Sequence, residues 1–347
     1  MMKKSFLTVL TVTMMATFSV SAEIASGTWE SVASEEKGGG SGTWSVSDDG
    51  VLTVSGTGYI KYHNNISDSP WYQYRRSITA INISEGITDI GEQTFVGLSK
   101  ATSLSLPETL KTIETRAFAN AGSVTSLYIP ASVTTIGDSA FRNFYELQTV
   151  TFAEDSHLTS FGTNNFDDTK LESIAFPQSL TTVGADMLSG GTTQNVFIPD
   201  TMDLDKSFFS SDLSDGHMYC ARSREEMCRN FVSGKCGASN KKCIDHYLQD
   251  VIKFYDVDKT CDTEGICTYN SYTVNGVTYY SYQEMVAALG FPVPLPKTDE
   301  IISGKDDAHG TVTHQGEKTG YKGKRIYTVE EANEAAGKKN KVIMRYR

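Results

Sequence analysis

The sequence is poor in positive charge and in long apolar runs. Its net charge is −11 over 347 residues, which argues against a nucleic-acid-binding protein, because phosphate backbones reward basic surfaces. After the first 22 residues no segment is long and apolar enough to cross a bilayer as a helix. No cysteine occurs before Cys220, so none follows the expected leader where a lipid could be attached. We therefore expect no membrane span in the mature chain.

Recognisable catalytic motifs are also missing. There is no phosphate-binding loop, no nucleophile elbow and no His-Glu-x-x-His pair. None of the six histidines accompanies a nucleophile and a carboxylate in a known motif: His63, His157, His217, His246, His309 and His314. The last two fall in a predicted linker, which cannot hold a rigid constellation. We expect no enzyme activity, no cofactor and no metal.

The first 22 residues have the pattern of a secretory signal peptide. Lys3 and Lys4 precede an apolar run over residues 6–20, and small residues up to Ala22 form a cleavage site before Glu23. A retained membrane anchor is the alternative, but the run is short and broken by threonines. The chain ends without a hydrophobic tail or a sortase-type motif. We expect an exported protein that is extracellular or held non-covalently at the cell surface.

The strongest pattern is a sequence repeat over residues 78–209. Three series recur every 23 residues: Phe95, Phe118 and Phe141; Ile90, Ile113 and Ile136; and Ile83, Leu106, Ile129 and Phe152. Two looser copies follow, with Phe176 and Ile198 at spacings of 24 and 22. About six copies with a period near 23 residues predict a leucine-rich-repeat solenoid.

Each copy predicts one coil of a mainly β solenoid. Leu104 and Leu106 alternate along a short strand, so both point to one face, and the next residue, a proline, ends the strand. An inward isoleucine and a glycine that permits a left-handed bend follow, and Phe118 returns to the interior. Stacked units share a core that one unit cannot form. The alternative is a β-sandwich with accidental periodicity.

Three copies read ITDIGEQTF (residues 87–95), LKTIETRAF (110–118) and SVTTIGDSAF (132–141). They resemble the BspA-type leucine-rich repeats of bacterial surface proteins. Residues 43–60 and 69–87 resemble the N-terminal β-cap of that family, so the resemblance covers residues 42 to about 220. Copies four to six drift, with Asp186-Met187-Leu188 in place of Ser-Ala-Phe. The resemblance implies a secreted, surface-associated protein that engages host matrix proteins or other cells.

Composition and pattern divide the chain into seven segments. Trp44 and Trp71 are expected in the core of the cap, because the first repeat of a solenoid exposes apolar core. We interpret the Gly-Thr-Trp at residues 27–29, echoed at 42–44, as a decayed duplicate. The segments are a signal peptide (1–22), a flexible leader (23–42), an N-terminal β-hairpin cap (43–77), the solenoid (78–220), a Cys-rich α+β cap with a hairpin and a helix (221–296), a linker (297–320) and a basic strand–helix–strand module (321–347).

All six cysteines follow the repeats: Cys220, Cys228, Cys236, Cys243, Cys261 and Cys267. In an exported chain they predict three disulfides, with 15 possible pairings that the sequence cannot choose between, although Cys261 and Cys267 could close a small loop. Zinc is the alternative, but no Cys-x-x-Cys pair exists. The acidic residues from Asp256 to Glu264 lack the central glycine and the final glutamate of an EF-hand.

The region after the cysteines predicts further small elements. Asn275-Gly276 separates two β-like runs as a hairpin turn. Ser281 and Glu284 form a capping box for a helix that Gly290 ends. Residues 318–347 contain nine Lys or Arg against three Glu. A module of about 27 residues is too small to be stable alone, so it must pack on the preceding region, a second chain or an envelope component.

Outward positions of the predicted strands define a candidate binding face. It is small, hydroxyl-rich and nearly uncharged, with Tyr128 and Phe197 as its large anchors. Ser/Thr ladders also suit exposed strands that have no function, whereas aromatic anchors on a flat face favour a protein partner. One column is Ala80, Ser103, Ser126, Thr149, Ser173 and Asn195, and the next is Asn82, Ser105, Tyr128, Thr151, Ala175 and Phe197. The candidate ligand-binding residues are the five members of this second column other than Ala175.

Two function hypotheses follow. The first is an adhesin-like protein that recognises host or neighbouring-cell proteins through this face. The second is a structural envelope or matrix component, in which the solenoid is a spacer and residues 321–347 are the attachment. They differ in whether affinity lies in the repeats or in the basic tail.

Overall fold

The computed structural model describes residues 22–31, 37–61, 66–204, 208, 216–236 and 239–294. The predicted linker and basic module, and the signal peptide up to residue 21, lie outside these residues. So do His63, His309 and His314. Within the described ranges no helix is long and apolar enough to cross a membrane.

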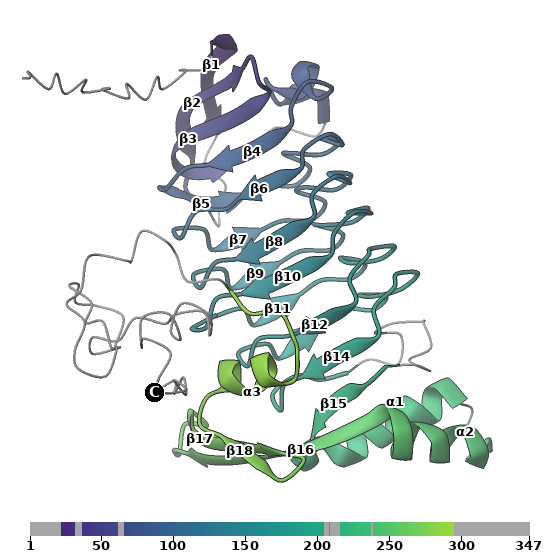
Figure 1. Ribbon diagram of the computed structural model, residues 1–347. Coiled ribbons are helices and arrows are strands. Elements are labelled where there is room, and N and C mark those ends of the chain that lie inside the picture. Colours follow the sequence, from purple (N-terminus) through teal and green to yellow (C-terminus); the bar gives the residue numbers. More distant parts are fainter. Residues whose placement is uncertain are drawn as a thin grey trace, which may run out of the picture.

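The repeats form a stack of coils, and each coil except the last contributes one strand to each of two faces (Figure 1). Strand pairs within each face are parallel and join residues one repeat apart, such as Ile81 with Leu104 and Leu127 with Val150. The predicted solenoid is confirmed. One face holds β4 (Ala80–Ile83), β6 (Ser103–Ser105), β8 (Ser126–Ile129), β10 (Thr149–Phe152), β12 (Ser173–Ala175) and β14 (Asn195–Ile198), and the other holds β5 (Ile87–Ile90), β7 (Thr112–Ile113), β9 (Thr135–Ile136), β11 (Ser160–Phe161) and β13 (Thr182–Val183).

An aromatic column runs through the core with one ring per coil. Trp71 of the cap stacks on Phe95 at 5.1 Å between ring centroids. The series continues through Phe118, Phe141 and Phe166 at centroid distances of 5.2, 5.8 and 6.1 Å, with ring planes within 12° of parallel. All five rings are fully buried. The regular phenylalanine spacing therefore stacks each coil in register on the one before.

The predicted left-handed bend is misplaced. The glycines after the inward residues, such as Gly137 and Gly162, do not have positive φ. They are needed because coils approach closely there: a Cβ at Gly137 would lie 2.6 Å from Thr115 N, and one at Gly162 would lie 2.5 Å from Asp138 N. Left-handed residues instead flank the buried phenylalanine, or Leu188 in the fifth coil, two residues before it (Gln93, Arg116, Ser139, Asn164, Asp186) and two after it (Gly97, Asn120, Asn143, Asp168, Gly190).

The N-terminal cap is larger than predicted. β1 (Glu23–Ser31), β2 (Gly40–Ser47) and β3 (Val51–Ile60) form an antiparallel sheet, and β3 then pairs in parallel with both β4 and β5. Two short 3-10 helices, η1 (Ile66–Asp68) and η2 (Tyr72–Tyr74), precede the first coil. The predicted flexible leader over residues 23–42 is wrong for β1 and the start of β2.

The echoed Gly-Thr-Trp explains this error. Gly27 pairs with Trp44, and Trp29 pairs with Gly42. Each tryptophan covers the glycine of the opposite strand, because a Cβ at Gly27 would lie 2.9 Å from Trp44 Nε1, and one at Gly42 would lie 2.7 Å from Trp29 Nε1. Both tryptophans are buried. The two copies are thus partners in one strand pair, and Trp44 and Trp71 occupy the cap core as predicted.

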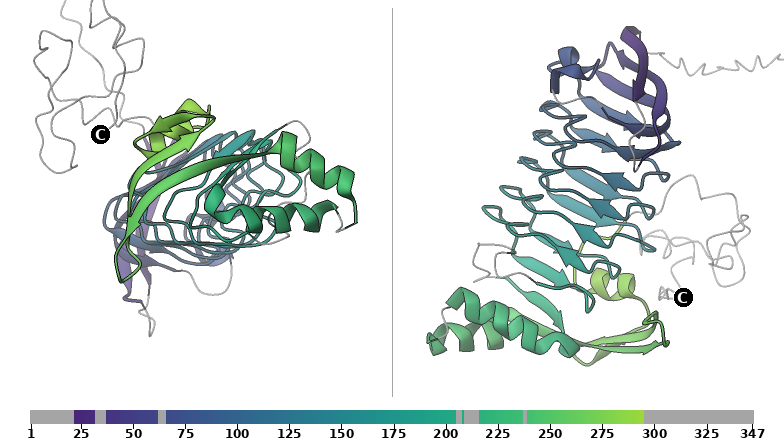
Figure 2. Two further views of the ribbon diagram at one scale, coloured as in Figure 1. Left: turned by 90° about the horizontal axis from the view of Figure 1, so that it is seen from below. Right: turned by 180° about the vertical axis from the view of Figure 1, so that it is seen from behind.

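The C-terminal region extends the solenoid and then turns away from it. β15 (Met218–Ala221) and β16 (Ile252–Cys261) continue the parallel order after β14, and β17 (Cys267–Val274) and β18 (Val277–Tyr279) add antiparallel strands. Figure 2 shows helices on both sides of this sheet. They are η3 (Arg222–Arg224), α1 (Glu225–Cys236), α2 (Lys241–His246), the π-helical turn η4 (Tyr247–Val251) and α3 (Tyr282–Ala288).

Local signals in this region behave as predicted. Asn275 and Gly276 both have positive φ in the turn between β17 and β18. Ser281 Oγ accepts a hydrogen bond from Glu284 N at 3.0 Å at the start of α3, and Gly290 has a φ of 85° after its end. The disulfides are Cys220–Cys228, Cys236–Cys243 and Cys261–Cys267, so the suggested small loop is confirmed.

Truncation of a central ring should destabilise the whole stack. We expect Phe118→Ala to lower the free energy of unfolding by ~3–5 kcal/mol, because the change leaves a cavity between two stacked rings. Guanidinium denaturation would measure it. Tyr145→Ala is the control, since that side chain is 49% exposed, and its cost should stay within about 0.5 kcal/mol. Equal costs for the two variants would contradict the role of the column.

Candidate functional site

The structure aligns four of the five predicted binding residues in one row. Asn82 pairs with Ser105 across β4 and β6, and Tyr128 pairs with Thr151 across β8 and β10. All four are exposed or half-buried, and Leu127 and Ile129 beside Tyr128 are buried. The neighbouring column of Ala80, Ser103, Ser126 and Thr149 is also in register and likewise uncharged. These strands therefore present a flat, hydroxyl-rich surface.

The fifth predicted residue is not on this surface. Phe197 is 0% exposed, so the prediction of an exposed anchor there is wrong. Its ring lies 4.7 Å from Tyr255, 5.3 Å from Tyr282 and 5.9 Å from Phe291, measured between centroids. These residues come from β16, α3 and the segment after α3, which fold over the C-terminal end of the strand face (Figure 1). Phe197 is thus the centre of a second apolar core.

Hydrogen bonds fasten this C-terminal region to the coils. Tyr255 Oη donates to Ile198 O at 2.8 Å, and Tyr282 Oη donates to Phe176 O. Both acceptors lie at the ends of strands on the same face. The contacts fix α3 and β16 against β12 and β14 and leave β4, β6, β8 and β10 uncovered by any part of the chain that the structure describes.

A buried carboxylate completes the junction. Asp200 pairs with Lys259 of β16, and its other oxygen accepts a hydrogen bond from Gln178 Nε2 at 3.2 Å. The Gln178 Oε1 atom accepts one from Tyr272 Oη. Each buried polar group of this set therefore has a partner, as stable polar junctions require.

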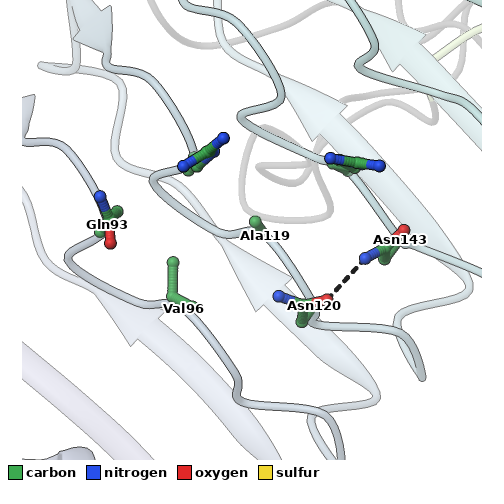
Figure 3. Close-up of a pocket in the computed structure, with 7 residues that line it drawn as sticks. Gln93, Val96, Ala119, Asn120 and Asn143 are labelled. Carbon is green, nitrogen blue, oxygen red and sulfur yellow. Dashed lines mark hydrogen bonds between the residues drawn. The ribbon is translucent and has the colours of Figure 1, made fainter. Parts of the chain in front are cut away.

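A separate hollow lies among the loops of the first three coils. It has a volume of about 260 Å³ and is lined by Gln93, Val96, Arg116, Ala119, Asn120, Arg142 and Asn143. Figure 3 shows Asn143 beside Asn120, where Asn143 Nδ2 donates to Asn120 Oδ1 at 2.6 Å. The predicted binding face does not include this hollow. Aligning the copies on their phenylalanines would have placed these residues in three columns, two positions before and one and two positions after the phenylalanine.

Other polar groups have structural contacts. Lys37 pairs with Glu114 at 2.7 Å and with Asp89 at 3.2 Å, which ties the cap to the first coils. Burial acts to lower the pKa of Lys37, but the two carboxylates outweigh it, so this pKa is raised. Burial, with help from Lys253, lowers the pKa of His217. In the described part of the chain, no three His, Cys, Asp or Glu residues gather as metal ligands would.

Comparison with known proteins agrees with this geometry. Residues 64–211 match the model of the BspA type Leucine rich repeat region in six copies, which confirms the resemblance of the repeats. No curated protein matches the chain.

Similar solved structures include bacterial leucine-rich-repeat proteins. The pneumococcal vaccine antigen PcpA is 20% identical over 49% of this chain and 49% of its own, with a TM-score of 0.32. A leucine-rich repeat protein from Bacteroides ovatus is 22% identical over 52% and 45%, with a TM-score of 0.36. A leucine rich cell surface protein from Faecalibacterium prausnitzii is 15% identical over 52% and 87%, with a TM-score of 0.25. The chain spans about half the length of the first two.

Alkaline pH should loosen the C-terminal region. Burial, together with Asp200, raises the pKa of Tyr269 to about 12, and burial also raises the pKa of Tyr255, Tyr272 and Tyr282 above its usual value. Because these folded-state values exceed the unfolded value near 10, their stabilisation is complete below about pH 10 and is lost as pH rises toward and past 12.

The test is the unfolding midpoint in guanidinium between pH 8 and 12, with tyrosinate absorbance followed in parallel. We expect the midpoint to fall above pH 10, and Tyr272→Phe to make that fall shallower. Tyr145→Phe, on the exposed loop, is the control and should leave the slope unchanged. A midpoint that stays constant to pH 12 would contradict the burial of these hydroxyls.

Proposed function

We propose that this protein, whose residues 64–211 form a BspA-type leucine-rich-repeat region, is an exported, adhesin-like binding protein without enzyme activity. Its partner is a protein of a host matrix or of a neighbouring cell. The binding surface is the part of the strand face on β4, β6, β8 and β10, which the C-terminal region does not cover in the part of the chain that the structure describes. The in-register row of Asn82, Ser105, Tyr128 and Thr151 is the observation that carries this proposal.

The chemistry of the row suits a protein partner. Adjacent parallel strands lie about 4.8 Å apart, so the four side chains make a ladder of short polar groups along a rigid backbone. Short hydroxyls and one amide lose little conformational entropy on binding. Tyr128 adds a large ring with a polar tip, the kind of side chain that is enriched at interface hot spots.

The two ends of this surface have different neighbours. At the N-terminal end it continues into the cap, because β3 pairs with β4. At the C-terminal end, α3 and the cluster around Phe197 cover the face. Among the described residues, the face is therefore open over four strands and bounded by α3 at its C-terminal end. Such a boundary favours one orientation of the partner along the repeated strands.

Two structural features support export of the protein. β1 begins at Glu23, directly after the predicted cleavage site, so the ordered cap starts where the mature chain would start. The three disulfides also suit an oxidising compartment. The proposed location is extracellular or at the cell surface.

The second candidate is a structural envelope component. The observation favouring it is the basic tail, nine Lys or Arg against three Glu over residues 318–347, on a chain of net charge −11. A tail of that charge would be attracted to anionic envelope polymers. The solenoid would then be a spacer rather than the binding element.

The first candidate is tested on the mature chain, residues 23–347. Partners would be captured from separate host-matrix and envelope preparations, and the dissociation constant of each purified partner would be measured. We expect Tyr128→Ala to raise that constant about tenfold or more, as loss of an aromatic hot spot does. Ser105→Glu should act similarly, because it puts an unpaired charge into the flat row.

Tyr145→Ala is the matched control, since it removes an exposed tyrosine from the loops rather than from the strand face. It should bind like the unaltered protein. A partner that binds Tyr128→Ala and Ser105→Glu as tightly as Tyr145→Ala would place the binding surface elsewhere.

The second candidate predicts a different dependence. Deletion of residues 321–347 should release the protein from the cell surface, and so should salt of about 1 M, which reduces the screening length to roughly 3 Å. Cell fractionation with and without salt measures both. Retention of the deleted chain in low salt would exclude the tail as the attachment.

A further inference from the structure

The loop hollow carries two arginines on an acidic protein. Arg116 and Arg142 come from adjacent coils and line the same hollow, while the whole chain has a net charge of −11. Arg142 Nε lies 3.5 Å from Asp167 Oδ2. In the part of the chain that the structure describes, Arg116 forms no ion pair within 4 Å. Of the two guanidinium groups, only that of Arg142 therefore has a carboxylate within ion-pair distance.

Nearby carboxylates have other partners. Glu92 Oε1 accepts from Gln93 Nε2 at 2.9 Å. Asp138 Oδ1 accepts from Thr163 N at 2.7 Å. Glu114, two residues before Arg116, pairs with Lys37 of the cap. These contacts leave the guanidinium of Arg116 as a local positive charge at the rim.

The rest of the lining offers neutral polar groups beside a small apolar patch. Asn143 Nδ2 donates to Asn120 Oδ1, which leaves the Asn120 amide donors and the Asn143 amide oxygen available to the hollow. Val96 and Ala119 lie between the polar groups, as Figure 3 shows. A paired donor and acceptor next to an apolar patch match a ligand that has both hydroxyls and a C–H face.

The rim is held in place by bonds between coils. Gln93 N donates to Thr115 O at 3.2 Å, Arg116 N to Asp138 O at 2.9 Å, and Asn120 N to Arg142 O at 2.9 Å. Gln93, Arg116, Asn120 and Asn143 also have left-handed backbone. Side chains that project from such a fixed backbone keep their relative positions, which is the condition for selective binding.

We propose that this hollow binds an acidic sugar, the carboxylate of a uronic or sialic acid unit. Arg116 and Arg142 bind the carboxylate, since guanidinium groups match its geometry. The amides of Asn120 and Asn143 hydrogen-bond the ring hydroxyls, and the ring's C–H face lies on Val96 and Ala119. A volume of about 260 Å³ admits a single sugar unit rather than a folded peptide.

This site is separate from the strand face and requires no protein partner. One variant distinguishes the hollow from the strand face: Tyr128→Ala should weaken binding of the protein partner and leave sugar binding unchanged. Equally, loss of sugar binding in a hollow variant should leave the captured protein partner in place if the strand face holds it.

The experiment titrates the mature chain with glucuronic acid, N-acetylneuraminic acid, glucose, acetate, sulfate and triglutamate, followed by calorimetry and ligand-observed NMR. We expect the two acidic sugars to bind, and glucose to bind at least tenfold more weakly. Arg116→Gln and Arg142→Gln should each weaken the acidic sugars at least fivefold. Arg76→Gln, an exposed arginine of the cap that is outside the hollow, makes the same charge change and should have no effect.

The thermal unfolding temperature of each variant shows whether a loss of binding comes from a loss of folding. Sugar binding by the unaltered chain tests the proposal without any variant. The absence of binding by both acidic sugars would overturn it. So would equal binding of glucose, equal competition by acetate or sulfate, tighter binding of triglutamate, or an Arg116→Gln variant that behaves like Arg76→Gln.

Discussion

The stacking of one buried aromatic ring per coil is the constraint on which the rest of the structure depends. Rings from Trp71 to Phe166 lie 5.1–6.1 Å apart, nearly parallel, so neighbouring coils cannot slide against each other without breaking the column. Parallel strand pairing on either side then puts residues one repeat apart next to one another. Any side chain repeated at the period of the sequence becomes a row on the surface.

Two such rows are the proposed binding sites. The caps at the two ends of the solenoid determine how much of each row a ligand can reach. The strand row presents hydroxyls and Tyr128, and the loop row gathers arginines and amides in the hollow. The N-terminal cap supplies the first ring of the column, and its strand β3 pairs with β4 at the N-terminal end of the strand row. The C-terminal region uses Phe197 as the centre of its own core and covers the end of the strand row.

Local features were predictable because short-range chemistry decides them. The turn at Asn275-Gly276, the cap at Ser281 and the bridge between Cys261 and Cys267 each depend on residues within about ten positions of one another. Two predictions were wrong because the residues that decide the structure lie far apart in the sequence or follow no recognisable sequence pattern. In the alternation of inward and outward residues along its strand, Phe197 falls at an outward position. It is nevertheless buried, because Tyr255, Tyr282 and Phe291 pack over it. The composition of residues 23–42 is that of a linker. Those in β1 and at the start of β2 form strands instead, because Trp29 packs on Gly42 of β2.

The sequence by itself therefore determined the period, the number of coils, the inward residues of the regular copies and the row to which each outward residue belongs. These follow from a repeat that can bury its apolar side only against copies of itself. Tertiary structure alone decided which part of each row is open, which cysteines pair across α1 and α2, and that Arg116, Arg142 and two asparagines share one hollow. Such contacts depend on the path of the chain between coils and past the last one, and that path is set by packing across long sequence separations rather than by any local pattern.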